Sequence, residues 1–236
     1  MALTVMNNRR PVDPGLSIIV SARNEGPSIG EVISKSTNYS NDVIVVDGHS
    51  EDDTQTISKS LGARVYKDNK KGKGDAMRVG LSHANNEIIV FIDADGSHDP
   101  DDIPRLLQPI QDQSADMVIG SRPRGGSDEL HGDLNKFMRM IGSDIITLGI
   151  NYRYGVRLTD SQNGFRAVKR DVALSLGLNE NSTTIEQEML MKALRRGYRV
   201  FEVPTHEYAR KHGVSTIKLS RVWFRYIYSW VKGLLF

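Results

Sequence analysis

The sequence predicts an α/β protein with a mainly parallel sheet and helices on both faces. In the first half, short apolar runs alternate with helix-like segments, and each run ends in a polar or acidic turn. The apolar runs are residues 16–20, 43–46, 63–66 and 87–92, and the helix-like segments are 27–38, 52–61 and 73–84. This alternation is typical of right-handed βαβ units. Because open α/β sheets bind ligands beyond the carboxyl ends of their strands, we expect the functional residues in these turns.

The second half continues the sheet with a different pattern. We predict a helix over 100–113 and a fifth strand over 117–120. A glycine-containing loop after Arg122 leads into a long helix over 130–148, and the remaining elements are a strand over 164–168, a helix over 184–196 and a strand over 198–203. Since no repeat or linker divides the chain, residues 16–218 are expected to form one domain.

The two ends of the chain differ in character. Residues 1–15 lack apolar periodicity and are expected to form a flexible arm. Residues 219–236 predict an amphipathic helix with both tryptophans, and its polar stripe contains Arg221, Arg225, Ser229 and Lys232. Such a helix is typical of a membrane interface, and the alternative is packing on the domain or on a second subunit. No apolar run reaches the ~20 residues of a membrane span. We therefore expect a cytoplasmic protein, peripheral at the inner face of a membrane.

Composition excludes several functions. The chain has 31 lysines and arginines against 29 acids, so its net charge of +2 does not indicate a nucleic-acid partner. It contains no cysteine, which excludes disulfides and thiolate metal sites. A bound metal would therefore have oxygen or imidazole ligands. The composition predicts no oligomeric state.

The strongest motif is Asp93-Ala94-Asp95, which follows an apolar strand directly. Two carboxylates in one turn offer hard oxygen ligands to Mg²⁺ or Mn²⁺ and leave coordination positions for diphosphate oxygens. The alternative is a solvated acidic turn. An EF-hand fits poorly, because Gly96 falls at the fourth loop position and Pro104 takes the twelfth, where glutamate is needed.

The other strand ends predict contacts to a nucleotide. Asp47 ends the second strand, where a carboxylate can accept hydrogen bonds from a nucleoside, whereas Asp52 or Asp53 can cap the next helix. Lys73 belongs to the glycine-containing loop 71–76, whose backbone amides could approach a nucleotide. A solvated lysine turn is the alternative for this loop.

From Leu16 to Lys218 the chain resembles the family 2 glycosyltransferases of the GT-A fold, especially the dolichyl-phosphate mannosyltransferase branch. The motifs that carry the resemblance are, in order, 20–25 (VSARNE), 45–48 (VVDG), 93–96 (DADG), 120–122 (GSR), 163–166 (NGFR) and 210–215 (RKHGVS). The resemblance implies a Rossmann-like sheet with a nucleotide-binding part over about 16–122 and an acceptor part over about 123–218. It also implies a Mg²⁺ or Mn²⁺ cofactor.

The resemblance implies roles for individual residues. Donor contacts fall on Ser21, Arg23, Glu25, Val45, Asp47, Asp93, Ala94, Asp95, Arg122 and Arg210, and we add Lys73 from the loop described above. Metal ligands fall on Asp93, Asp95 and Ser97, where the family usually has glutamine in place of Ser97. The family also usually has proline and a tyrosine-like residue at Ser21 and Arg23. It has a lysine at Thr216, for which Lys218 is the candidate replacement.

The resemblance also implies the reaction, an inverting transfer from a GDP-mannose or UDP-glucose type of donor to a polyprenyl or dolichyl phosphate. Asp95, Arg122, Arg139, Ser143 and Arg210 are the implied catalytic residues, and the arginines suit phosphate geometry. A phosphate acceptor is already a nucleophile at neutral pH and needs no base.

Two rival functions stay open. A soluble hydroxyl acceptor or a growing glycan would need a base, for which Glu188, Glu186 and Asp160 are candidates. The glutamates can equally be the solvated first turn of a helix. The second rival is a nucleotidyltransferase that makes the sugar nucleotide, although the chain lacks a convincing triphosphate loop near its first strand.

Overall fold

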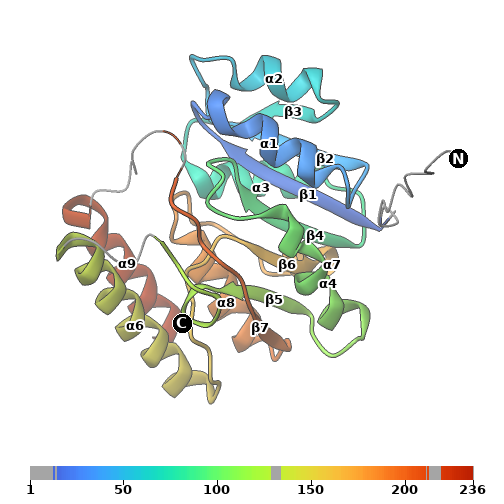
Figure 1. Cartoon of the computed structure of the whole chain (residues 1–236). Coiled ribbons are helices and arrows are strands. Elements are labelled where there is room, and N and C mark those ends of the chain that lie inside the picture. Colours follow the sequence, from blue (N-terminus) through green and yellow to red (C-terminus); the bar gives the residue numbers. More distant parts are fainter. Residues whose placement is uncertain (1–12, 14, 129–133, 211, 213–218, 236) are drawn as a thin grey trace, which may run out of the picture.

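Seven strands form one sheet in the order β3-β2-β1-β4-β6-β5-β7 (Figure 1). The computed structural model describes residues 13, 15–128, 134–210, 212 and 219–235. The strands are β1 (Leu16–Ala22), β2 (Asp42–Asp47), β3 (Arg64–Lys67), β4 (Ile88–Asp93), β5 (Met117–Ser121), β6 (Arg166–Lys169) and β7 (Val200–Pro204). The predicted mainly parallel sheet is confirmed, because only β6 runs antiparallel to its neighbours, between β4 and β5. The pattern of the sequence did not predict that insertion.

The strand register brings several predicted residues to one edge of the sheet. β1 lies between β2 and β4, with Ser21 level with Asp93 and Ala22 level with Asp47. All three strands are parallel, so their carboxyl ends meet at this edge. The polar turns that follow them therefore lie together, as the alternation predicted.

Helices cover both faces of the sheet, as predicted. One face carries α1 (Gly26–Ser36), α2 (Thr54–Ser60), η1 (Pro100–Asp102) and α4 (Ile103–Gln111). The other face carries α3 (Lys73–His83), α7 (Arg170–Ser175) and α8 (Ile185–Arg195). Gly80 lets α3 approach the sheet closely, since a Cβ atom there would lie 2.4 Å from Ile19 Cγ2.

Two further helices lie side by side at one side of the sheet (Figure 1), after the short α5 (Arg122–Gly125). They are α6 (Leu134–Tyr154), which ends later than the predicted 148, and α9 (Leu219–Leu235), which confirms the predicted helix. The inner face of α9 packs on α6 and α8. Trp230 lies against Gly149 of α6, where a Cβ atom would come within 2.2 Å of the indole ring.

The outer face of α9 is apolar. Its exposed side chains are 42–69% accessible: Trp223, Phe224, Ile227, Tyr228, Val231 and Leu235. The predicted polar stripe is wrong at Ser229, which is 4% exposed because it packs inward, whereas Arg225 and Lys232 are exposed. The side chain of Arg221 lies outside the described part.

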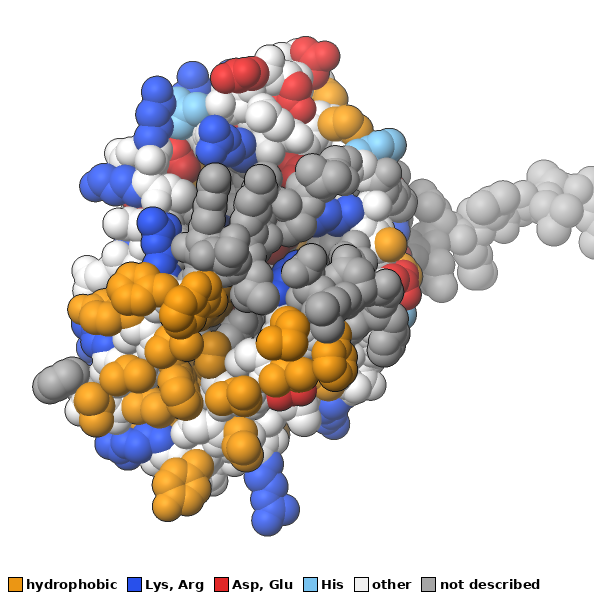
Figure 2. Space-filling view, turned by 90° about the vertical axis from the view of Figure 1, so that its left-hand side faces the viewer, with side chains coloured by type: hydrophobic (Ala, Val, Ile, Leu, Met, Phe, Trp, Pro, Cys, Tyr) orange, Lys and Arg blue, Asp and Glu red, His pale blue; other side chains and the backbone are white. Residues whose placement is uncertain are grey.

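Exposed apolar side chains of α6 extend the surface formed by α9. Figure 2 shows hydrophobic side chains gathered over the face that these two helices form. The contributions of α6 are Phe137, Met138, Ile145, Leu148 and Tyr152. We call the combined set, six residues of α9 and these of α6, the α6/α9 apolar surface. Within the described residues, no helix combines the length and apolar character needed to span a membrane.

Candidate functional site

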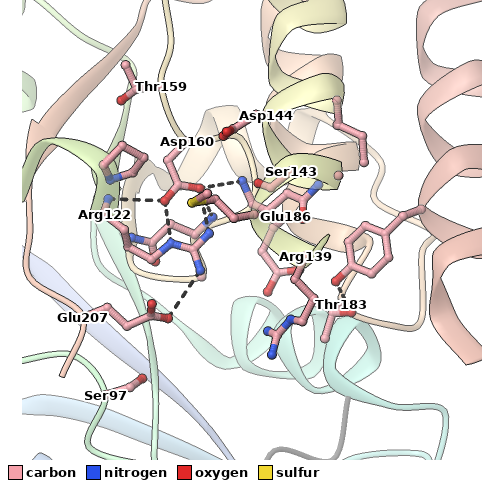
Figure 3. Close-up of a pocket in the computed structure, with 18 of the residues that line it drawn as sticks. Ser97, Arg122, Arg139, Ser143, Asp144, Thr159, Asp160, Thr183, Glu186 and Glu207 are labelled. Atoms are coloured by element: carbon pink, nitrogen blue, oxygen red, sulfur yellow. Dashed lines mark hydrogen bonds and ion pairs between the residues drawn. The ribbon is translucent and has the colours of Figure 1, made fainter. Parts of the chain in front are cut away.

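A pocket of about 350 Å³ lies where the carboxyl ends of β4 and β5 face α6 and α9. It brings together residues that are far apart in the sequence. The predicted site residues that line it are Lys73, Asp93, Asp95, Ser97, Arg122, Arg139, Ser143 and Arg210. Figure 3 shows this pocket, with Arg139, Ser143 and Asp144 projecting from α6.

Asp93 belongs to a network of three ionisable side chains, in which Lys73 and Asp93 are partly exposed and Glu186 is buried. Lys73 Nζ lies 2.8 Å from the Asp93 carboxylate and 2.7 Å from Glu186 Oε1. Burial opposes the charged form of Lys73, but Asp93 and Glu186 outweigh burial and raise its pKa. Burial likewise opposes ionisation of Asp93, but Lys73 outweighs it and holds the pKa of that carboxyl below its ordinary value. Both groups therefore carry charge at neutral pH.

Asp95 has a different set of partners. Its Oδ1 accepts hydrogen bonds from the backbone N–H of Ser97 at 3.0 Å and from the Ser97 hydroxyl at 2.7 Å. Its Oδ2 lies 2.8 Å from Arg210 NH2. Ala94 is 1% exposed and packs in the core, so its side chain is not available to a donor. Ala94 stays a prediction for donor binding, which would have to be through its backbone.

The chemistry of the two carboxylates fits a divalent cation shared with a diphosphate. Asp93 and Asp95 are hard oxygen donors in one turn, and each already holds a positively charged side chain. Among the described residues, no cluster of three or more acidic, histidine or cysteine side chains offers an all-protein metal site. Phosphate oxygens and water would therefore have to complete the coordination of an ion here.

Arg122 is held between two carboxylates. Figure 3 shows it linked to Asp160 and Glu207, with Nε 2.6 Å and NH2 2.9 Å from the Asp160 carboxylate and NH1 3.3 Å from Glu207. Burial is outweighed by Asp160, which raises the pKa of Arg122. Asp160 also accepts hydrogen bonds from the N–H groups of Gln162 and Asn163. The Asp160 carboxylate is therefore occupied by these contacts, which argues against its predicted role as a catalytic base.

The wall of the pocket opposite the strand ends comes from α6 and α9. Arg139 and Ser143 of α6 both line it, as their spacing of four residues predicted. From α9, Tyr226 enters the pocket and donates a hydrogen bond of 2.6 Å to Thr183 Oγ1. Burial, and after it Glu186, raises the pKa of Tyr226, so its hydroxyl stays protonated.

The predicted nucleoside contacts lie outside this pocket. Arg23 is exposed beyond β1, and Glu25, half-buried, accepts a hydrogen bond from Ser28 at 3.1 Å. Burial, opposed by Ser28 and reinforced by Asp95, raises the pKa of Glu25. Ser21 is partly exposed at the end of β1. These three residues remain predictions for donor binding.

Two predicted nucleoside contacts do not fit this geometry. Val45 is fully buried, because β2 pairs it with Val20 on one side and Val65 on the other. Asp47 is also fully buried. Its carboxylate accepts from Ser50 N at 3.1 Å and Gln55 Nε2 at 2.9 Å, which gives it a role in holding the loop after β2. Neither side chain is accessible to a ligand here.

The glycine-containing loop before α3 contributes to the pocket in an unexpected way. Gly74 N donates to Asn181 O at 3.0 Å, and a Cβ atom at Gly74 would lie 2.2 Å from Glu180 O. The glycine therefore serves close packing against the segment before α8, and its own backbone amide is already bonded there. Lys73 reaches the pocket through its side chain instead.

Glu188, a predicted candidate base, does not line this pocket. Its carboxylate accepts hydrogen bonds from the backbone N–H groups of Asn179 and Glu180 and pairs with Lys192 at 2.7 Å. It therefore holds the loop that precedes α8. The candidate Lys218 lies outside the described residues.

Several pocket residues were not predicted. His98 is 4% exposed and stacks on Phe165 with ring centroids 5.3 Å apart, and burial lowers its pKa. The neighbouring Arg166 is fully buried beneath the pocket, and burial lowers its pKa to about 10. Its position beside Asn163 and Glu186 depends on long-range packing, which leaves no local pattern in the sequence.

Comparison with known proteins gives consistent matches. Residues 17–177 match the family model described as glycosyl transferase family 2. Glycosyltransferase AglJ from Haloferax volcanii is 30% identical over 209 residues, covering 87% of this chain and 67% of that protein. The UDP-N-acetylglucosamine–dolichyl-phosphate N-acetylglucosaminyltransferase of Methanococcus voltae is 29% identical over 241 residues, covering 90% of this chain and 95% of that protein.

A solved structure has the same fold. The structure of glucosyl-3-phosphoglycerate synthase from Mycobacterium tuberculosis, in complex with Mn²⁺, UDP and glucosyl-3-phosphoglycerate, superposes with a TM-score of 0.74. The two chains are 21% identical, and the match covers 94% of this chain and 80% of the other. At this identity the likeness shows the shared architecture of sheet and covering helices.

Proposed function

The chain belongs to glycosyl transferase family 2 and has the GT-A fold predicted for it; since it is a glycosyltransferase that uses a nucleotide-sugar donor, we propose that its acceptor is a polyprenyl or dolichyl phosphate. The observation that carries this proposal is the composition of one pocket. Carboxylates and arginines line its strand side, and an apolar surface begins on its helix side. A phosphate attached to a long hydrocarbon matches that combination. The relative from Methanococcus voltae, whose name specifies dolichyl phosphate, supports the same choice.

The charged side of the pocket suits two phosphate-bearing substrates. Arg139 and Arg210 line it, and a guanidinium group can bind phosphate oxygens in pairs, whereas Arg122 is engaged by Asp160 and Glu207. Two anionic substrates repel each other as they approach, and fixed cations lower that cost. Glu188 lies outside the pocket and Asp160 is held by Arg122, which leaves Glu186 as the candidate base that a hydroxyl acceptor would need.

The proposed reaction is a single displacement with inversion. An oxygen of the acceptor phosphate attacks the anomeric carbon, the bond from that carbon to the donor diphosphate breaks, and the nucleoside diphosphate leaves with the electron pair. Asp93 and Asp95 would hold Mg²⁺ or Mn²⁺, which supplies Lewis-acid stabilisation to the leaving diphosphate. Arg210, beside Asp95, would bind a phosphate oxygen while the charge moves.

An apolar groove beside the pocket supports a lipid acceptor. The groove has a volume of about 480 Å³ and shares Pro123, Asp144, Ile145 and Thr159 with the pocket. Its other walls include Ile141, Leu148 and Leu158. A lipid phosphate held by the arginines could therefore leave its first isoprene units in this groove. A small soluble acceptor would leave this groove empty.

We propose that the α6/α9 apolar surface rests on a membrane that contains anionic lipids. Arg225 and Lys232 are exposed along one side of the outer face of α9, and Arg153 is exposed near the end of α6. Apolar side chains flanked by cations are typical of helices at a membrane interface. This placement would bring the groove to the surface from which a lipid phosphate enters.

A vesicle sedimentation experiment tests the membrane part. Replacing both Ile227 and Val231 of α9 by Asp should abolish binding to phosphatidylglycerol vesicles, because each side chain is more than 40% exposed on the outer face. The matched control is the pair Leu174→Asp and Phe201→Asp, which changes two equally exposed apolar residues on α7 and β7. Loss of binding in the control alone, or in neither variant, would refute the assignment of this surface.

A further inference from the structure

The two carboxylate oxygens of Glu186 differ in whether they have a partner. The side chain is 3% exposed, and Oε1 pairs with Lys73 at 2.7 Å. Oε2 is buried and has no hydrogen-bond partner among the residues that the structure describes. Leaving a buried carboxylate oxygen unpaired is costly, because the oxygen loses its hydration without a replacement. The residue lines the pocket, so a ligand bound there can supply the missing donor.

Gly164 keeps this part of the pocket open. A Cβ atom at Gly164 would lie 2.8 Å from Lys73 Nζ, 3.1 Å from Asp93 Oδ2 and 3.5 Å from Glu186 Oε1. Any side chain at this position would therefore crowd the Asp93, Lys73 and Glu186 network. Through Lys73, Glu186 is also tied to the carboxylate proposed to lie beside the donor diphosphate.

The unpaired groups around the pocket specify the kind of ligand. Glu186 Oε2 can only accept a hydrogen bond, whereas Trp230 Nε1, also buried and unpaired, can only donate one. A phosphate dianion has only acceptor oxygens and cannot satisfy Glu186. A hydroxyl group both donates and accepts, so a group with several hydroxyls matches the pocket better than a phosphate does.

We propose that Glu186 Oε2 accepts a hydrogen bond from a ring hydroxyl of the donor sugar and so determines which sugar is transferred. This inference rests on the proposed function, because it takes a nucleotide sugar as the ligand. Glu186 acts as a specificity residue that contacts the sugar. It takes no proton from the acceptor, since the acceptor is a phosphate.

The test combines a change in the protein with a change in the substrate. The wild-type enzyme is assayed with its preferred nucleotide sugar and with analogues that each lack one ring hydroxyl. Removing the hydroxyl that Glu186 binds should lower kcat/KM by about tenfold to a hundredfold, as expected for a hydrogen bond to a charged group. In Glu186→Gln the hydroxyl would meet a neutral amide in place of a carboxylate, so the same analogue should lose less than about threefold relative to the parent donor.

Binding measurements give a readout that does not depend on the acceptor. Calorimetry should show Glu186→Gln weakening the nucleotide sugar while leaving the affinity for the nucleoside diphosphate unchanged. Glu87→Gln is the charge-matched control, because Glu87 is exposed just before β4, at the end opposite to Asp93. It should keep the full analogue penalty and both affinities.

Three outcomes would overturn the inference. If no single hydroxyl matters to the wild-type enzyme, no sugar hydroxyl binds Glu186, and this result needs no variant that must fold. If Glu186→Gln keeps the same analogue penalty, another residue binds the hydroxyl. If the variant binds the nucleotide sugar normally but loses turnover more than about a thousandfold, Glu186 is a base for a hydroxyl acceptor. A wild-type enzyme that transfers sugar from no donor would instead refute the proposed function.

Discussion

At the residue scale, two positively charged side chains accompany the two strand-end carboxylates. Lys73 pairs with Asp93, and Arg210 pairs with Asp95. Lys73 keeps the Asp93 carboxylate ionised, because an adjacent cation offsets its loss of hydration. A diphosphate that arrives with a metal ion brings both negative and positive charge. Asp93 and Asp95 can then exchange their present partners for the metal ion, and Lys73 and Arg210 can exchange theirs for phosphate oxygens.

Substitution of Arg210 tests the role of that residue in the proposed transfer. Arg210→Ala should lower kcat about a hundredfold and change the affinity for the nucleotide sugar by less than about threefold, because the interaction with phosphate strengthens as charge develops. Steady-state kinetics and calorimetry measure the two quantities. Arg210→Lys, which keeps the charge without the paired donors, should recover part of kcat. Equal losses of kcat and affinity would count against the role.

The sequence predicted the acids of the site better than their partners. Asp93 and Asp95 follow a continuous apolar strand, so local pattern alone marks them. Glu186 and Asp160 come from segments whose contacts depend on the packing of α8 and of the loop before β6. The choice between Glu186 and Glu188 could not be made from the sequence for the same reason: only the fold decides which glutamate of a helical first turn faces the pocket.

At the element scale, the position of α9 depends on a glycine in α6. Gly149→Ala should lower Tm by about 3 to 10 °C, since a Cβ atom 2.2 Å from the Trp230 ring forces the two helices apart. Gly142→Ala in the same helix is the matched control, because a Cβ atom there meets nothing within 4 Å. Calorimetry should show an unchanged or raised Tm for the control, as alanine favours helix. Equal effects at both positions would contradict the packing described for α9.

Asp116 links three strands just before β5 begins. Its carboxylate accepts from Arg199 Nε at 3.0 Å, before β7, and pairs with Lys169 of β6 at 2.7 Å. The hydrogen bonds from Arg199 hold the pKa of Asp116 well below its ordinary value. A depressed pKa stabilises the folded state above the unfolded pKa of about 4, and the stabilisation is lost as the pH falls towards the folded pKa.

Substitution of Asp116 should therefore have a pH-dependent effect. Asp116→Asn should lower the free energy of unfolding by about 1 to 2 kcal/mol at pH 7, a modest value because the Arg199 side chain is half exposed. The difference from wild type should shrink steadily below about pH 4. Urea denaturation at several pH values measures it, and a difference that stays constant between pH 7 and pH 3 would exclude this linkage.

The elements themselves were predictable where hydrophobic periodicity is strong. The four strands and three helices of the first half follow the βαβ alternation, and each was predicted near its observed position. The direction of β6 was not predictable, because a four-residue strand with three buried residues has the same pattern in a parallel or an antiparallel orientation. The short α7 was also missed, since six residues give less than two helical turns of pattern.

At the scale of the whole molecule, the charged edge of the sheet and the apolar surface meet at one pocket. β4 and β5 bring carboxylates and Arg122 from one side, while α6 and α9 bring Arg139 and the apolar surface from the other. The arrangement gives the water-soluble donor and the lipid acceptor separate approaches. The sequence predicted the charged residues at the strand ends and the amphipathic C-terminal helix separately, but only the fold places them around one pocket.

The most direct test is transfer of label from a panel of nucleotide sugars to a short polyprenyl phosphate, with Mg²⁺ or Mn²⁺ added. We predict label in the organic phase that requires the metal and is absent with Asp95→Ala, because Asp95 would hold the ion that stabilises the leaving diphosphate. Transfer of label to a soluble hydroxyl acceptor, with none to the lipid, would contradict the account.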